Sequence, residues 1–464
     1  MNPNRAVAAA SLLLLLNGCA IRTPPVPEAA GVAAPAQWAE PVPPGQGALA
    51  QWWRVFDDPM LVQLVEAALA ANTDVGIARA NLLQARAARE QAAAALFPRL
   101  TATLSAQRAA PSGGSTRNAF EAGFDAGWEA DLFGATRHGV AAQDALVAAS
   151  EASLAATQVS LAAEVAQAYL QLRGAQVRAA VARDNLASQL ETLQISEWRQ
   201  QAGLASAVDV EQARSAAEQT RAQLPLLESA AAQSAHALGV LTGRTPEAIR
   251  QQLSVPAPLP QPQAGLAVAV PAQALRQRPD VAAAEHRLRS AAEQVAQADA
   301  ARYPNLQLGA SLAWSGVTLG SVGSVSAARS LLASLAQPLF DGGNLAAQLK
   351  GRQAQYDAAR ESYRASVLAA LQDVEDALVA LAADRQRLAA LQTALDAARN
   401  AALLATQRYA SGVIDFQTVL ETQRTLLNVQ DSVASAETEL ASAHVRLYKA
   451  LGGGWQPAAP ETRS

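Results

Sequence analysis

The fold is decided by thirteen residues, FEAGFDAGWEADL, which run from Phe120 to Leu132. Every second residue of this stretch is apolar, whereas the residues between them include four acids: Glu121, Asp125, Glu129 and Asp131. Such alternation gives a β-strand one apolar and one polar face. A transmembrane β-barrel needs strands of this kind, because lipid covers one face and water the other. We therefore predict a barrel strand at about 119–133 whose acids face a water-filled lumen. A soluble hairpin lying on a helix bundle is the alternative.

Three further segments alternate in the same way and are predicted strands, at about 99–108, 305–315 and 328–340. Four strands cannot close a barrel, because the smallest single-chain barrels have about eight. The sequence therefore predicts that several copies of the chain contribute strands to one barrel.

An internal repeat organises the rest of the chain. Residues 74–75, Asp-Val, recur 206 positions later as 280–281, and Pro98 recurs as Pro304. The order of helix, proline, strand, long helix and return helix is also repeated, which chance repetition of Ala-rich helix would not reproduce. We predict one unit at 51–243 and its copy at 271–455, with a Pro-rich linker at 244–270 and a tail at 456–464.

Each repeat predicts a long helix that coils against partners. Between Gly134 and Gln201 there is no proline, and apolar residues recur every seven positions, as they do again in the second repeat. A sustained heptad pattern is typical of coiled helices. Alanine, about a quarter of the chain, favours helix and permits close packing. The expected fold class is mainly α-helical with a β-barrel portion, in which two tandem repeats supply four strands and long antiparallel coiled-coil helices.

Composition excludes several functions. Half of the residues are apolar and the net charge is only −4, which argues against a disordered chain. With 36 basic and 40 acidic residues there is no basic excess for binding nucleic acid. The histidines have no metal-ligand spacing, and neither a phosphate loop nor a nucleophile elbow occurs. We therefore expect no enzyme activity, no cofactor and no metal site. The four histidines are His138, His236, His286 and His444.

The N-terminus predicts export and lipid attachment. Residues 1–18 have a basic residue followed by an apolar run, as in a secretory signal peptide. The run ends in Leu-Asn-Gly-Cys, which resembles the cleavage motif of bacterial lipoproteins, with Cys19 as the lipidated residue. Residues 19–50 are rich in Pro and Ala and are expected to form an extended tether with nothing to pack against. Beyond it we expect no transmembrane helix, because no run of about 18 uncharged apolar residues follows.

Six motifs in order along the chain make the sequence similar to the TolC/OprM outer-membrane efflux factor family, in its NodT-type lipoprotein branch. The motifs are Trp52–Pro59, Trp128–Gly134, Arg276–Val281, Gln337–Gly343, Tyr409–Val413 and Leu451–Trp455. The resemblance implies a homotrimer with a 12-stranded barrel in the outer membrane, four strands from each of three chains, and a helical tunnel in the periplasm. It also implies a periplasmic adaptor and an inner-membrane RND-type pump as partners. The expected function is a passive conduit for small molecules; protein secretion of type I, or a lipid-anchored periplasmic coiled-coil scaffold, are the alternatives.

The same resemblance implies two kinds of functional residue. The periplasmic gate of the family is held by acids on the second return helix, which here places Glu421 and, one turn later, Arg424 at the gate. The other gate candidates are Thr418, Asp209 and Asp415. Adaptors dock in the family at the turns between the long and return helices. In this chain those turns hold Gly203, Leu204, Gly412 and Val413.

Overall fold

The computed structural model describes residues 21–33, 35–39, 51–110, 112, 116–262, 274–275, 278–319 and 322–455. The predicted signal peptide, Cys19 and the tail at 456–464 lie outside the described residues, as do much of the tether and part of the linker. The chain divides into two compact units. The first comprises Met1–Val32, Ala80–Glu151 and Ala282–Ser366, and the second comprises Ala33–Arg79, Ala152–Val281 and Val367–Ser464.

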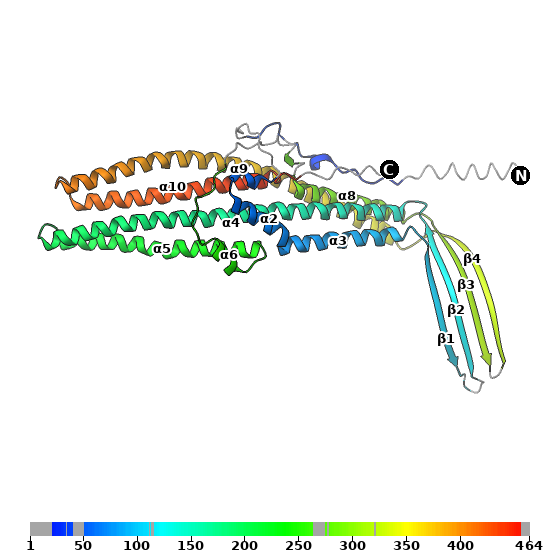
Figure 1. Ribbon diagram of the computed structural model, residues 1–464. Coiled ribbons are helices and arrows are strands. Elements are labelled where there is room, and N and C mark those ends of the chain that lie inside the picture. Colours follow the sequence, from blue (N-terminus) through cyan, green and yellow to red (C-terminus); the bar gives the residue numbers. More distant parts are fainter. Residues whose placement is uncertain are drawn as a thin grey trace. The chain divides into compact units, whose positions relative to one another are not determined.

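The first unit contains one antiparallel sheet of four strands in the order β1-β2-β3-β4 (Figure 1). The strands are β1 (Arg99–Ala109), β2 (Arg117–Ala130), β3 (Asn305–Leu319) and β4 (Val322–Ala336). All four predicted strands are present, but none has exactly the predicted ends: β1 ends one residue later, β2 is shifted towards the N-terminus, β3 ends four residues later, and β4 begins and ends earlier. β4 begins six residues before the predicted 328, because its pairing with β3 extends to Leu319 and Val322. It ends before Pro338, which has no N–H for a sheet hydrogen bond.

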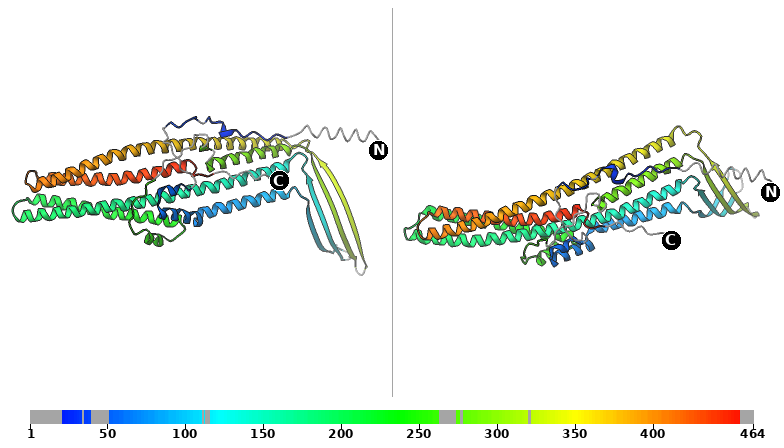
Figure 2. Two further views of the ribbon diagram at one scale, coloured as in Figure 1. Left: turned by 45° about the horizontal axis from the view of Figure 1, so that its top comes forward. Right: turned by 90° about the horizontal axis from the view of Figure 1, so that it is seen from above.

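The long helices and their return helices are also where the sequence predicts them. α4 (Ala135–Gln201) and α9 (Asn344–Ala410) run through both units. In the first unit α3 (Thr73–Ala94) lies beside α4, and α8 (Pro279–Ala300) lies beside α9 (Figures 1 and 2). In the second unit α5 (Ala207–Leu241) returns along α4, and α10 (Phe416–Ala450) returns along α9. We call α4–α5 hairpin 1 and α9–α10 hairpin 2.

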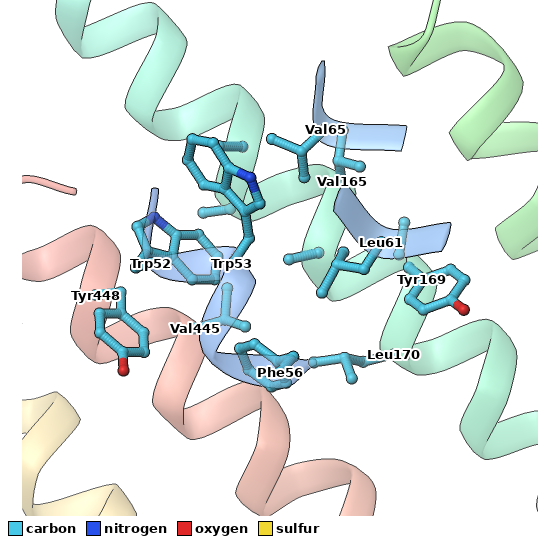
Figure 3. Close-up of a cluster of buried hydrophobic side chains, with 14 of the residues drawn as sticks. Trp52, Trp53, Phe56, Leu61, Val65, Val165, Tyr169, Leu170, Val445 and Tyr448 are labelled. Atoms are coloured by element: carbon cyan, nitrogen blue, oxygen red, sulfur yellow. The ribbon is translucent and has the colours of Figure 1, made fainter. Parts of the chain in front are cut away.

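An apolar cluster in the second unit accounts for the first of the six motifs. The short 3-10 helix η2 (Trp52–Phe56) inserts its aromatic side chains between α4 and α10 (Figure 3). Trp52 stacks on Tyr448 with ring centroids 5.1 Å apart. Asp58 caps α2 (Pro59–Ala71), and its second carboxylate oxygen accepts a hydrogen bond of 2.8 Å from the Tyr169 hydroxyl of α4. The motif therefore fixes the start of the repeat to both hairpins.

The two repeats fasten the end of each return helix with equivalent residues. In repeat 1, Asn72 Nδ2 donates to the carbonyl oxygen of Leu241, in the last turn of α5, at 3.0 Å. In repeat 2, Arg278 Nη1 donates to the carbonyl oxygen of Ala450, in the last turn of α10, also at 3.0 Å. Arg278 lies 206 positions after Asn72, the offset of the sequence repeat. Repeat 2 thus uses a charged residue where repeat 1 uses a neutral one.

The described part of the N-terminal segment is not a free tether. In the first unit the Tyr356 hydroxyl of α9 donates to the carbonyl oxygen of Pro25 at 2.6 Å. In the second unit the backbone N–H of Ala39 donates to Glu375 Oε1, also on α9, at 3.0 Å. The expectation of an extended tether with nothing to pack against is therefore wrong for these residues. Composition alone does not predict these contacts, because one partner in each hydrogen bond is a backbone group, which every residue type has.

Two helical segments, Pro59–Ala94 and Ala135–Gln201, are long and apolar enough to cross a membrane by length and composition alone. In α4 part of the apolar surface is instead covered by packing. Val165, Leu172 and Ala179, at the predicted heptad spacing, are all buried between helices. A membrane is not needed to cover that face of α4.

Candidate functional site

The polar face of the sheet carries three of the four predicted lumen acids. Cross-strand partners point to the same side of a sheet, so rows of polar side chains can be read from the register. Asp125 is paired with Ser311 of β3, and Glu121 is paired with Ser315. The hydroxyls of Ser311 and Ser315 lie 2.8 Å from those of their β4 partners, Ser330 and Ser326. Glu129 lies on the same face of β2, at the end nearer the helices.

The fourth acid, Asp131, does not belong to this face. β2 ends at Ala130, so the predicted strand at 119–133 is too long at this end. The Asp131 carboxylate accepts hydrogen bonds from the backbone N–H groups of Thr136 and Arg137, at 3.2 and 2.9 Å, and pairs with the Arg137 side chain at 3.1 Å. It therefore satisfies free N–H groups at the start of α4, where negative charge is favourable. An acid next to a strand end resembles a strand acid in sequence, which explains the error.

The opposite face of the sheet is apolar and exposed in the single chain. Phe124 and Trp128 of β2 are paired with Leu312 and Leu308 of β3 and share their side of the sheet. A row of exposed large apolar side chains on one face, opposite a row of acids, is the pattern of a barrel wall. The exposed large apolar residues on this face are Leu100, Leu104, Phe120, Phe124, Trp128, Leu308, Leu312, Trp314, Val325, Leu331 and Leu335.

The two hairpins end in turns of the same geometry. Gly203 and Gly412 have φ angles of +73° and +74°, a conformation that glycine adopts at little cost after a helix. The next residue in each turn, Leu204 or Val413, donates its backbone N–H to the carbonyl five residues earlier, at 2.7 and 3.0 Å. Both side chains are about 70% exposed, at 69% and 70%. Each hairpin therefore has an exposed apolar side chain in the turn at its tip.

Three of the gate candidates cap the return helices that follow these turns. Asp209 and Ser206 form a reciprocal capping box at the start of α5. At the equivalent place in α10, Asp415 Oδ1 accepts hydrogen bonds from the backbone N–H and the hydroxyl of Thr418, at 2.8 and 2.6 Å. These bonds from Thr418 hold the pKa of the Asp415 carboxyl below its usual range. The local geometry thus accounts for Asp209, Asp415 and Thr418 as helix caps.

Glu421 and Arg424 are exposed side by side on α10, one turn apart. Within the described part of the chain neither residue makes an ion pair. Both side chains are free to face other helices.

A polar seam joins the two hairpins, which sequence reasoning missed. We use this name for Arg178, Asn185 and Thr192 of α4 with their partners Asp431, Gln430 and Gln423 of α10. Arg178 makes a bidentate ion pair with Asp431, at 2.7 and 3.0 Å. The amide of Asn185 donates to Gln430 Oε1 at 2.6 Å, and Gln423 Nε2 donates to the Thr192 hydroxyl at 3.0 Å. The three α4 residues are seven apart, so a polar heptad was visible beside the apolar one.

Some buried polar groups near the seam lack hydrogen-bond partners. Gln189 and Gln423 each have a buried side-chain oxygen without a hydrogen-bond partner among the described residues. Above the seam α4 and α10 approach closely at Gly174, where an added Cβ would lie 2.4 Å from the hydroxyl oxygen of Thr438. At the tip the Arg199 guanidinium lies 4.5 Å from the ring centre of Tyr409 in hairpin 2. Polar contacts therefore join the hairpins towards their tips, where apolar residues such as Val419 and Leu427 are also buried.

Comparison with family models matches the chain to the outer membrane efflux protein family over residues 64–244 and again over 270–453. The two matched segments correspond to the two sequence repeats. The chain is 35% identical over 460 residues to the pyoverdine export outer membrane protein OpmQ of Pseudomonas aeruginosa, with 96% of each chain covered. It is 33% identical over 468 residues to the toluene efflux pump outer membrane protein TtgI of Pseudomonas putida, covering 96% of this chain and 97% of that one.

Solved structures of similar fold agree with this. The outer-membrane channel OprN superposes with a TM-score of 0.85 at 37% identity, covering 94% of this chain and 98% of OprN. The outer membrane protein VceC of Vibrio cholerae superposes with a TM-score of 0.80 at 26% identity, covering 88% and 100%.

Proposed function

The chain belongs to the outer membrane efflux protein family, and from this premise we propose that three copies close one 12-stranded barrel in the outer membrane. The protein is an efflux channel with a TolC-like fold and is not an enzyme. A single observation carries the assembly: β1 and β4 are the edges of a four-stranded sheet that is too narrow to close on itself. In the trimer, β4 of one copy pairs with β1 of the next, and Glu121, Asp125 and Glu129 face the lumen.

The partners follow from the family. We propose that a periplasmic adaptor docks on the turns at Gly203–Leu204 and Gly412–Val413, where the bare Leu204 and Val413 side chains offer apolar contacts. An inner-membrane pump supplies the energy, since one of the relatives is the outer membrane protein of a toluene efflux pump. Cys19 carries the lipid that holds the N-terminus in the outer membrane. The cargo is a small molecule, since the relatives named above export pyoverdine and toluene.

For the gate we propose two elements with different roles. Three Glu421 side chains near the axis repel one another and favour cations, so they set the conductance of the resting channel. The polar seam sets how readily hairpin 2 separates from hairpin 1. The Arg178 and Asp431 side chains are 37% and 38% exposed, so this pair is worth only about 1 kcal/mol in each chain. If three chains open together, losing it shifts the equilibrium by about 3 kcal/mol, or roughly 150-fold.

Single-channel recording in planar bilayers tests the function and the gate together. The purified protein should form channels that conduct rarely or weakly at rest. Glu421→Ala should raise the conductance and lower the cation preference, whereas Gln212→Ala, at the equivalent place in repeat 1, should change neither. Arg178→Ala should raise the open fraction. Its matched control is Arg183→Ala, because Arg183 pairs with Glu228 at 2.7 Å within hairpin 1.

Different outcomes of these recordings test the assembly, the polar seam and Glu421 separately. A protein that forms no channels, or that elutes as a monomer, contradicts the assembly. Channels that respond equally to the Arg178 and Arg183 substitutions contradict the role of the seam. Unchanged conductance and selectivity in Glu421→Ala contradict the role of Glu421.

A further inference from the structure

One charged residue lies in the middle of the apolar face of the sheet. Arg329 of β4 is paired with Leu312 of β3, which is paired in turn with Phe124 of β2. Residues paired across strands share a face, so Arg329 points to the same side as Leu312 and Phe124. The other β4 residues on that side are Gly323 at the loop end and then Val325, Ala327, Leu331, Ala333 and Leu335.

The depth of Arg329 can be counted along β4. Successive residues on one face are about 6.6 Å apart along a strand, or about 5 Å in height at the usual barrel tilt. The six positions from Leu335 to Val325 therefore span about 25 Å, the height of the apolar band of a barrel. Arg329 is the third of the six from Val325, which places it about 10 Å below the edge of the band on the side of the hairpin loops. Those loops lie at the end of the sheet away from the helices (Figure 1), so this edge faces the cell exterior.

No carboxylate in the described part of the chain pairs with Arg329. Among the described strand residues the acids, Glu121, Asp125 and Glu129, all lie on the opposite face. Arg329 makes no ion pair or hydrogen bond to a side chain within the described residues. A neighbouring copy cannot supply an acid from its edge strand either, because β1 contains none. An unpaired arginine in the apolar band destabilises a barrel, and the effect is largest at mid-depth.

The surroundings of Arg329 suit an acyl chain. Arg329 lines a shallow hollow of about 570 Å³ together with Leu100, Phe124, Leu312 and Leu331. A second hollow of about 450 Å³, lined in part by Phe120, Trp314 and Val325, lies further towards the loops. The arginine thus lies beside two apolar hollows on the face that we assign to lipid.

We propose that Arg329 binds a phosphate of lipopolysaccharide, the phosphate-bearing lipid of the outer leaflet, whose acyl chains occupy the two hollows. This inference rests on the proposed barrel, because only the barrel turns the apolar face towards lipid. Arginine suits the role, since its guanidinium stays charged and binds phosphate through two parallel hydrogen bonds. Its long stem lies along the apolar surface while the charged group extends towards the headgroups.

Binding of purified lipid A to the detergent-solubilised full-length protein tests the proposal. Wild-type protein should bind bis-phosphorylated lipid A at least ten times more tightly than lipid A stripped of its phosphates, or than phosphatidylglycerol. Arg329→Leu, which suits an apolar face, should abolish this preference. Arg108→Leu, at the loop end of the same face, should retain it. Equal binding by wild type and Arg329→Leu would overturn the proposal, and so would a preference for phosphatidylglycerol.

Channel recording of the same samples shows whether a negative binding result contradicts only the lipid site or the barrel as well. If Arg329→Leu and wild type both form channels yet bind lipid A equally, only the lipid site is wrong. If wild type forms no channels, the barrel itself is wrong. Without lipid A, Arg329→Leu should withstand heat at least as well as wild type, because its apolar face no longer holds an unpaired charge.

Discussion

Replacing Arg278 by methionine should release the end of α10 while leaving the rest of the fold in place. Arg278 is 9% exposed, and each of its side-chain nitrogens donates a hydrogen bond. It bonds the carboxylates of Asp280 and Asp373, at 2.8 and 2.9 Å, as well as the carbonyl oxygen of Ala450. Methionine has a similar length and no donor, so the substitution removes these bonds without opening a large cavity.

The magnitude can be worked out from the exposure of each partner. Asp280 and Asp373 are 48% and 53% exposed, so water can replace the guanidinium and each pair is worth no more than about 1 kcal/mol. The Ala450 carbonyl belongs to a buried residue, and losing its donor costs about 1–3 kcal/mol. Only the bond to Ala450 holds α10, because Asp280 and Asp373 lie on α8 and α9. Its loss of about 1–3 kcal/mol corresponds to roughly 5- to 150-fold more frequent opening of the last turns of α10.

Hydrogen exchange read by mass spectrometry measures this opening directly. In detergent micelles, peptides covering residues 443–451 should exchange roughly 5- to 150-fold faster in Arg278→Met than in wild type. Peptides from the tip of hairpin 2 should not change. Arg278→Lys should restore only part of the protection, because an ammonium group cannot make the bidentate bond to Asp280 and reach Ala450 in the same geometry.

The equivalent residue of repeat 1 is the control. Asn72→Ala removes one neutral bond to Leu241 and a helix cap, so peptides covering residues 236–242 should lose only about 1–2 kcal/mol of protection. Unchanged exchange at 443–451 in Arg278→Met would refute the reasoning. So would an equal increase along the whole chain.

Three further results are expected. Gly174→Ala should destabilise the detergent-solubilised protein by about 1–3 kcal/mol in thermal unfolding, because the new Cβ meets Thr438; Gly76→Ala, with nothing within 4 Å, should not, and equal effects would count against close packing at Gly174. Burial and the hydrogen bond to Asp58 raise the pKa of Tyr169 to about 12. The stability that this neutral hydroxyl contributes is therefore fully present below pH 10 and is lost as the pH rises towards 12. The thermal midpoint of Tyr169→Phe should fall less than that of wild type over this range. An identical fall in the two proteins would contradict the role of the hydroxyl. Gly203→Ala should speed hydrogen exchange of the hairpin 1 tip, because its φ of +73° costs an alanine about 1–2 kcal/mol, and unaltered exchange there would show that the turn tolerates a side chain.

Local periodicity was enough to predict most of the fold. The alternation from Phe120 to Ala130 gave the right strand and the right faces, because period-two patterns are set by neighbours in sequence. The heptad through Val165 and Leu172 likewise predicted helix packing. Strand ends were harder: Asp131 continues the pattern of β2 but caps α4, and only the hydrogen bonds of the folded chain distinguish the two roles.

The missed functional residues depend on contacts between distant segments. Arg178 and Asp431 are 253 residues apart, so neither residue's neighbours in sequence reveal the pair. Arg329 was missed for a different reason. The strand was predicted to begin at 328, which made an arginine at its second position look like an end residue. Pairing with β3 places Arg329 in the middle of β4 instead.

The polar seam has a thermodynamic consequence for the channel. Breaking the three bonded pairs of the seam would wet carboxylate, guanidinium and amide groups. Exposure of polar surface lowers the heat capacity, whereas exposure of apolar surface raises it. The seam should therefore lower the heat-capacity change of opening. The enthalpy of opening would then rise less steeply with temperature than it would for a wholly apolar contact between the hairpins.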